Sequence, residues 1–127
     1  MVGLNRSDSD PKGQQASRRL RPADVVVVEH HYPDAFALLR ERGPHALAVL
    51  HALLSRAALL DDGSLVACGS VRDIAAQLEC VSKDSVHRAL RSLVRTGVLE
   101  PYATAPSTYV AHVDGAGITV RIPNPRF

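Results

Sequence analysis

The sequence is short of aromatic residues and of cysteine. It contains no tryptophan, three tyrosines and two phenylalanines, so its core must be built from Leu, Val and Ala side chains. Its two cysteines, Cys68 and Cys80, are too few for the disulfide framework of a small secreted domain. With 127 residues, the chain is long enough for one domain with a genuine core but short for two.

Long uninterrupted apolar runs are also missing. The longest, from residue 46 to residue 60, is broken by His51, Ser55 and Arg56, so it falls short of a membrane span. The opening stretch "MVGLNRSDSD" has no apolar region of the kind found in secretory signals. We therefore expect a cytoplasmic protein without a membrane partner. Heavy use of Arg and Ala, with only two lysines, is typical of a GC-rich bacterial genome.

Catalytic and metal-binding motifs are absent from the sequence as well. There is no nucleophile elbow, no glycine-rich phosphate loop and no HExxH pair. None of the six histidines is spaced from a cysteine as in a structural zinc site. The sequence therefore predicts neither an enzyme nor a bound cofactor or metal. A thiol switch at Cys80 and a histidine metal sensor stay open, beside the simpler interpretations of a buried cysteine and of packing histidines.

The first 22 residues form a polar segment with almost no apolar side chains. Such a segment cannot bury enough surface to offset its ordering entropy, so we expect residues 1–22 to be disordered. It ends in the basic cluster "SRRLR", which is either a solubilising tail or an arm that contacts phosphates or a minor groove. Residues 23–127 are then expected to form a single domain.

The first half of this domain is predicted to contain two strands and two helices. Four consecutive valines in "DVVVVEH" (24–30) predict a strand covered on both faces, by the core on one and by a second subunit on the other. A helix is expected from near Pro33 to Gly43. The apolar stretch 44–60 predicts a further helix, central to the core or shared with a dimer contact. "DDGS" is a turn, and "LVAC" is a short strand.

The second half is predicted to contain two amphipathic helices and three strands, which makes the domain mainly α with a small β-meander, an α+β fold. Ser70 and Ser82 are the expected N-caps of the helices, and Gly97 ends the second one. The strands "VLEPY", "TYVAHV" and "ITVRI" form the meander, because the stretches between them, "ATAPS" and "DGAG", read as turns. The apolar stripe of the second helix consists of Val86, Ala89, Leu90, Leu93 and Val94.

The second of these helices concentrates positive charge. Between Ser82 and Thr96, basic residues outnumber acids by four to one, which gives +3 in a chain of net charge +2. The three arginines recur at helical spacing opposite the apolar stripe, so they form one ridge about the width of a major groove. This basic face, as we call it, consists of Lys83, Arg88, Arg91 and Arg95.

The order helix, strand, helix, helix and hairpin, with "VSKDSVHRALRSLVRTGVL", resembles the winged helix-turn-helix regulators of bacteria, the MarR-like and GntR-like groups. The resemblance covers residues 44–122 and is most specific at "IAAQL" (74–78), "VSKDSV" (81–86) and "GVL" (97–99). It implies a winged helix-turn-helix fold that binds double-stranded DNA sequence-specifically near the nucleoid and regulates transcription.

The resemblance also implies roles for single residues. Arg88 is the residue that we expect on a guanine edge. Base readout is expected from Lys83, Asp84, His87 and Arg88. Phosphate contacts are expected from Ser70, Arg72, Ser82, Ser85, Arg91 and Arg95.

Two features depart from the family pattern. The wing is expected at "ATAPS", with "DGAG" as the other candidate, and "ATAPS" contains no Lys or Arg, which weakens a minor-groove contact. The turn between the helices reads "LECVS" (78–82), where leucine, glycine, valine and serine are usual. Glycine serves there because one residue takes a positive φ, and we expect the longer turn to relieve that demand.

One recognition helix offers few base contacts, so we expect a homodimer that reads half-sites about 10 base pairs apart, or a multiple of that spacing. The candidate dimer contacts are the N-terminal strand and the apolar helix 46–60. Replication or segregation of plasmid or phage DNA is the alternative process. A winged helix that binds proteins instead of DNA is the alternative of another class, and a plain packed helix pair with a solvated basic face is the simplest interpretation.

Overall fold

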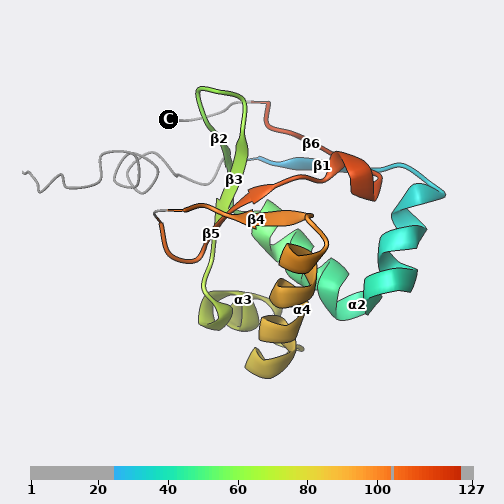
Figure 1. Cartoon of the computed structure of the whole chain (residues 1–127), viewed down its shortest axis with the longest axis vertical. Helices are drawn as coiled ribbons and strands as arrows, with labels where there is room; N and C mark the ends of the chain where they lie inside the picture. The colour runs from blue at the N-terminus through green and yellow to red at the C-terminus, as the bar shows by residue number, and fades with distance from the viewer. Residues whose placement is uncertain (1–24, 104, 124–127) are drawn as a thin grey trace, which may run out of the picture.

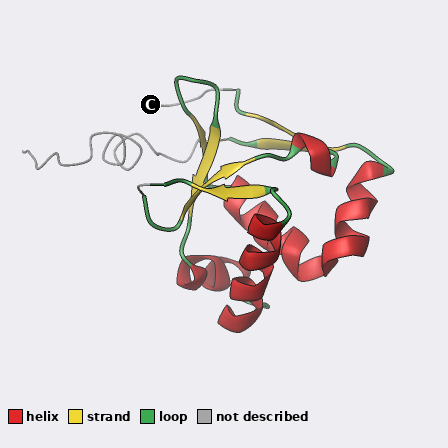
Figure 2. Ribbon diagram, in the orientation of Figure 1, coloured by secondary structure: helices red, strands yellow, loops and turns green. Residues whose placement is uncertain are grey.

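The computed structural model describes residues 25–103 and 105–123, and the predicted tail, 1–22, lies outside them. Within these residues the chain is an α+β protein with three α-helices, a short 3₁₀ helix and two antiparallel sheets (Figures 1 and 2). The elements in chain order are β1 (Val27–His30), α2 (Asp34–Leu54), β2 (Ala57–Leu59), β3 (Leu65–Cys68), α3 (Val71–Leu78), α4 (Lys83–Arg95), β4 (Leu99–Pro101), β5 (Thr108–Ala111), η1 (Asp114–Ala116) and β6 (Ile118–Arg121).

α2 consists of two helical segments joined at a sharp break. Gly43 has φ 89° and ψ 171°, which ends the first segment. Pro44 begins the second, where its missing N–H leaves no hydrogen bond unmade. The predicted end of the first helix at Gly43 is confirmed by this break. In Figure 1 the first segment stands at one side of the molecule, and the second runs behind α4 toward the strands.

The second segment of α2 ends earlier than its apolar pattern predicts. The helix stops at Leu54, and residues 57–59 form β2, which pairs with β3. The Ser55 hydroxyl donates to the Ala52 carbonyl oxygen at 2.6 Å and closes the last turn. The predicted helix as far as residue 60 is therefore wrong, because a short apolar run fits a buried strand as well as a helix.

The core surrounds the second segment of α2 and is aliphatic, as predicted. Leu50, Leu53 and Leu54 are 0% exposed, and they belong to one cluster with Ile74 of α3 and Leu93 of α4. The leucines of this helix are therefore buried inside the chain. None of the described helices combines the length and the apolarity needed to cross a bilayer.

The larger sheet has the strand order β2–β3–β5–β4, with every pair antiparallel. β4 and β5 form a hairpin in which Leu99 lies opposite Ala111. β3, the strand that leads into α3, pairs with β5 of this hairpin. The sheet therefore joins the chain before α3 to the chain after α4, and both helices lie below the strands in Figure 2.

β6 does not continue this sheet, so the predicted three-stranded meander is wrong. The "DGAG" stretch forms η1 instead of a tight hairpin turn. Beyond it, β6 pairs with β1, with Val28 opposite Val120 and His30 opposite Ile118. The predicted strand at 24–30 is confirmed from Val27 onward. Val28 of this strand packs against the core, whereas Val25, which precedes the strand, is 57% exposed.

Two neighbouring histidines, His30 and His31, contact side chains of α2 and β6. The ring of His30 stacks on that of His51 from α2, with centroids 4.9 Å apart. His31 Nε2 lies 2.7 Å from Thr119 Oγ1 on β6. Burial lowers the pKa of His51, and the charge of protonated His30 lowers that pKa further. His30 and His51 therefore pack on each other. The described residues contain no group of three or more His, Cys, Asp or Glu able to hold a metal ion.

Gly117 follows the 3₁₀ helix and lies against the first residues of α2. Its φ is +72°, and a Cβ placed on it would lie 2.7 Å from Asp34 Cβ and 2.8 Å from Ala35 N. We expect Gly117→Ala to lower the free energy of unfolding by about 3 kcal/mol, because it adds left-handed backbone strain to overpacking. Urea denaturation measures this loss. Gly115→Ala is the matched control, since a Cβ there meets nothing within 4 Å; equal losses in the two variants would contradict the prediction.

Candidate nucleic-acid interface

α3 and α4 both begin at serines that cap them. Ser70 Oγ accepts a hydrogen bond from Asp73 N at 3.0 Å, and Asp73 Oδ2 accepts one from Ser70 N at 3.2 Å. These hydrogen bonds lower the pKa of the Asp73 carboxyl group and form a capping box. Ser82 Oγ accepts from Ser85 N at 3.1 Å at the start of α4. Both predicted caps are confirmed, so the two helix starts are well defined.

α4 has one face in the core and one in solvent. Val86, Ala89, Leu90 and Leu93 are buried, and the helix packs against α2 and α3. The four residues of the basic face are all exposed. Among the described residues, ion pairs join Arg121 to Glu29 and His112 to Glu100, and none involves the basic face. Its positive charges are therefore not neutralised by neighbouring carboxylates of the described chain.

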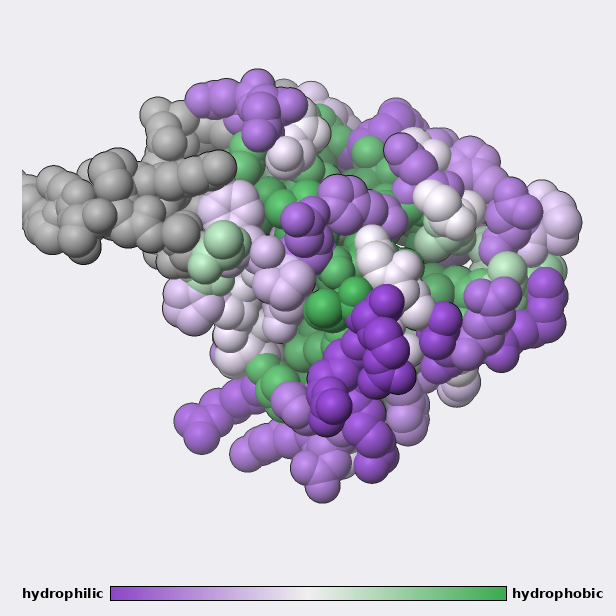
Figure 3. Space-filling model, in the orientation of Figure 1, coloured by the Kyte–Doolittle hydropathy of each residue, from purple (hydrophilic) through white to green (hydrophobic). Residues whose placement is uncertain are grey.

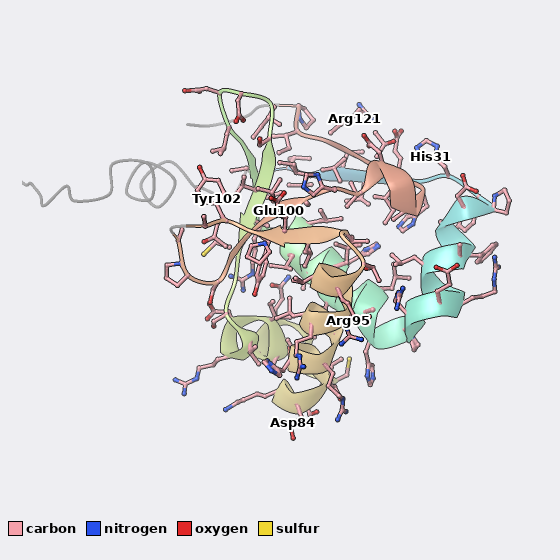
Figure 4. The ribbon with its side chains drawn as sticks, in the orientation of Figure 1. His31, Asp84, Arg95, Glu100, Tyr102 and Arg121 are labelled. Carbon is pink, nitrogen blue, oxygen red and sulfur yellow. The ribbon has the colours of Figure 1, made fainter. Side chains whose placement is uncertain are left out.

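Strongly hydrophilic surface follows α4 on the side turned toward the viewer in Figure 3. Figure 4 shows the two ends of this surface, with Asp84 at the free tip of the helix and Arg95 near the end that meets the sheet. Arg88 Nη2 donates to Ser85 Oγ at 3.3 Å, and Ser82 Oγ donates to the same oxygen at 3.1 Å. The first turn of α4 is thus a small polar network that holds the Arg88 side chain along the helix.

A groove of about 640 Å³ lies between α4 and the β4–β5 hairpin. Leu90, Val94 and the half-buried Tyr109 form apolar walls of the groove. Burial raises the pKa of the Tyr109 hydroxyl, and electrostatic repulsion from Cys68 raises it further. Among the described residues, none that lines the groove is acidic, and Arg91 and Arg95 bring positive charge to it. Its polar residues are His87, Arg91 and Arg95 on the helix, with Ser107 and Thr108 on the hairpin.

The residues predicted to contact DNA fall into two groups in the structure. Those on α4 and its cap share the solvent side of the helix: Lys83, Asp84, His87, Arg88, Arg91 and Arg95 are exposed there, with Ser82 and Ser85 at its start. Ser70 and Arg72 belong to the start of α3. The Ser70 hydroxyl is occupied as an acceptor by the capping box, whereas Arg72 is exposed.

Sequence reasoning missed the hairpin side of the groove and a network that holds α3 against α2. Arg56 Nε donates to Gln77 Oε1 at 2.9 Å, and Gln77 Nε2 donates to Ser55 Oγ at 2.9 Å. The interruption of the apolar run by Ser55 and Arg56 was the available signal. Nothing local marks the hairpin residues, because they line the groove only once β5 pairs with β3 and places the hairpin beside α4.

Glu79 has a positive φ in the turn between α3 and α4. Its φ is 64°, so the longer turn does not remove the need for a residue with positive φ, and that expectation is wrong. The N–H of Glu79 donates to the Ala75 carbonyl at 2.9 Å and closes α3. A non-glycine residue at this φ costs about 1–2 kcal/mol.

Cys68 and Cys80 are both exposed, so the interpretation of a buried, inert cysteine is wrong for each. Cys68 ends β3, and Cys80 lies in the turn beside Glu79. They are free thiols on separate elements.

Comparison with protein-family models, curated proteins and solved structures returned no match. The function of the chain therefore has to be inferred from the chemistry of this interface.

Replacing Glu79 with glycine should stabilise the protein. The glycine removes the strain at φ 64°, while its greater freedom in the unfolded chain offsets part of the gain, so we expect the free energy of unfolding to rise by about 0.5–1 kcal/mol. Glu79→Ala loses the same charge but keeps its Cβ, and it should give no such gain. Urea denaturation measures the free energy of unfolding of both variants. An equal rise in the alanine variant would refute backbone strain as the cause.

Proposed function

We propose that the chain is a winged helix-turn-helix protein that binds double-stranded DNA sequence-specifically as a homodimer and regulates transcription. In this proposal α3 and α4 are the helix-turn-helix, and α4 is the recognition helix. The β4–β5 hairpin is the wing. The order helix, two strands, helix, helix, hairpin supports it, together with the pairing of β3 with the hairpin in the sheet β2–β3–β5–β4.

The basic face is the main support for this proposal. Four exposed cations lie on a helix whose opposite side is fixed in the core, and the described chain offers them no carboxylate partner. Cations already paired within the protein would have to give up those partners to bind phosphate. Unpaired cations can neutralise phosphates directly and release the counterions of DNA, which is the main source of affinity in such complexes.

The positions along α4 divide the expected contacts. Lys83, Asp84 and Arg88 lie in the N-terminal half of the helix, the part that enters the major groove in helix-turn-helix complexes. A carboxylate such as Asp84 is repelled by phosphates but can accept a hydrogen bond from a cytosine amino group. Arg91 and Arg95 lie nearer the sheet, where they border the groove beside the hairpin, and we assign them to phosphates.

The groove between α4 and the hairpin suits a sugar–phosphate strand. Its apolar walls, which include Val94 and Tyr109, can pack against deoxyribose, while Arg91 and Arg95 face the phosphates. The hairpin residues that line the groove carry no charge, so the helix must supply the electrostatic contacts. The same apolar walls favour the alternative of another class, in which the groove holds an apolar side chain of a partner protein.

Charge reversal on α4 separates these two functions. The double variant Arg88→Glu, Arg91→Glu should lose binding to genomic DNA fragments by at least about 100-fold, because two attractive contacts become repulsive. Fluorescence anisotropy measures the binding, and circular dichroism checks the fold. The matched control Arg40→Glu, Arg42→Glu makes the same charge change at exposed positions of α2 and should retain binding. Binding that survives in the α4 variant, or a wild type that binds no DNA at low salt, would reject the proposal.

Salt dependence tests the assignment of single phosphate contacts. The slope of log Kd against log salt should fall by about 1 for Arg95→Ala relative to wild type, because each phosphate contact releases about one counterion. Arg40→Ala, an exposed arginine on the first segment of α2, should leave the slope unchanged. If the Arg95 variant keeps the wild-type slope, this residue does not contact a phosphate.

A further inference from the structure

The outer edge of β1 is open within the described part of the chain. β1 has one hydrogen-bonded neighbour there, β6. The His31 N–H donates to the Gly117 carbonyl oxygen at 2.7 Å. Because the direction of backbone groups alternates along an antiparallel strand, Val27 and Glu29 then face β6. The N–H and C=O groups of the intervening residues, Val26 and Val28, point away from it, and the described residues supply no partner for them.

This edge lacks the features that protect β4, one of the two edge strands of the larger sheet. β4, an edge of the larger sheet, contains Glu100 and Pro101, and charged residues and proline both discourage pairing with another chain. Residues 25–28 contain neither. The nearest charge, on Glu29, is already neutralised by Arg121 at 3.4 Å.

Exposed apolar side chains gather around the same strand. The exposed large hydrophobic residues in the described chain are Val25 at 57%, Tyr32 at 64% and Phe36 at 46%. Val25 precedes β1 and the other two follow it, with the rings of Tyr32 and Phe36 4.6 Å apart. A two-stranded sheet is marginally stable by itself, and exposed apolar surface beside an open strand edge marks a contact site.

We propose that the outer edge of β1 pairs antiparallel with β1 of a second copy, about a two-fold axis at Val27. The charges favour a second copy as the partner strand. When the valine run pairs with the same run of a second copy, no two like charges lie opposite each other, and Glu29 lies opposite the partner's Val25. An antiparallel strand is also self-complementary about a two-fold axis, because each donor meets an acceptor. The homodimer belongs to the proposed function, and this inference deepens it by giving the contact, without depending on DNA binding.

The register follows from the direction of the backbone groups. Val26 and Val28 exchange hydrogen bonds with the partner's Val28 and Val26, and the two ribbons merge into one sheet, β6–β1–β1–β6. Val27 faces the partner's Val27 in a non-hydrogen-bonded pair, in which the Cα atoms lie about 4.5 Å apart. Its side chain is on the face opposite Val28, which packs on the core, so a substitution of Val27 changes the contact and spares the core.

Val27→Lys and Val27→Glu test the proposal in the full chain without DNA. Sedimentation equilibrium should show a dimer for the wild type. Each variant should raise the dimer Kd at least about tenfold, because like charges then face each other across the axis. Mixing the two variants should restore a one-to-one heterodimer in native mass spectrometry, since Lys then faces Glu. A role of Val27 in folding alone would not produce this rescue.

Two further variants keep the test decisive. Val26→Pro removes an outward N–H but keeps the ladder to β6, so it should also give monomers even if the charged variants fail to fold. Ala103→Lys, an exposed position in the hairpin loop, adds the same charge away from β1 and should remain dimeric. A wild type that stays monomeric into the millimolar range, dimers that persist in the β1 variants, or a mixture without heterodimer would each overturn the proposal. These results leave the α4 charge-reversal test untouched.

Discussion

The structure depends on the burial of one helical segment, residues 44–54 of α2. Leu50, Leu53 and Leu54 have no exposed surface, and the helix that carries them contacts α3, α4, β3 and η1. Because α3 and α4 both pack on it, their apolar faces turn inward, and the polar side of α4 is left in solvent. The orientation of the basic face is therefore a consequence of aliphatic packing, not of any contact that the basic residues make themselves.

The helices α3 and α4 could be predicted closely from the sequence because their signals are local. Ser70 and Ser82 cap them, and an apolar period with Gly97 at its end gives the length of α4. The placement of β6 could not be predicted, because "DGAG" is compatible with a hairpin and nothing nearby specifies β1 as the partner. β2 was missed for a related reason: an apolar run that is buried on every side has no period that separates strand from helix.

The candidate site also has a part that the sequence predicts and a part that it does not. All of its basic residues lie on one helix, so spacing and charge alone placed them on one face. The groove needs the hairpin to stand beside α4, and that depends on the pairing of β3 with β5. Glu79 shows a different limit, since the length of a turn does not reveal which of its residues takes a positive φ. The proposed function rests on these side chains, because a fold of this kind does not by itself specify an activity.

The break at Gly43 has a consequence for an assembly built from two such chains. The first segment of α2 follows β1 along the chain, and the segment that carries the core leucines begins after the break. A Cβ at Gly43 would meet nothing within 4 Å, so packing does not dictate the residue there; only its backbone angles do. In a β1-paired dimer this break would not act as a free joint, because Val28, Ile118 and the stacking of His30 on His51 hold the β1–β6 ribbon on the core. The distance between the two α4 helices would then depend on that packing.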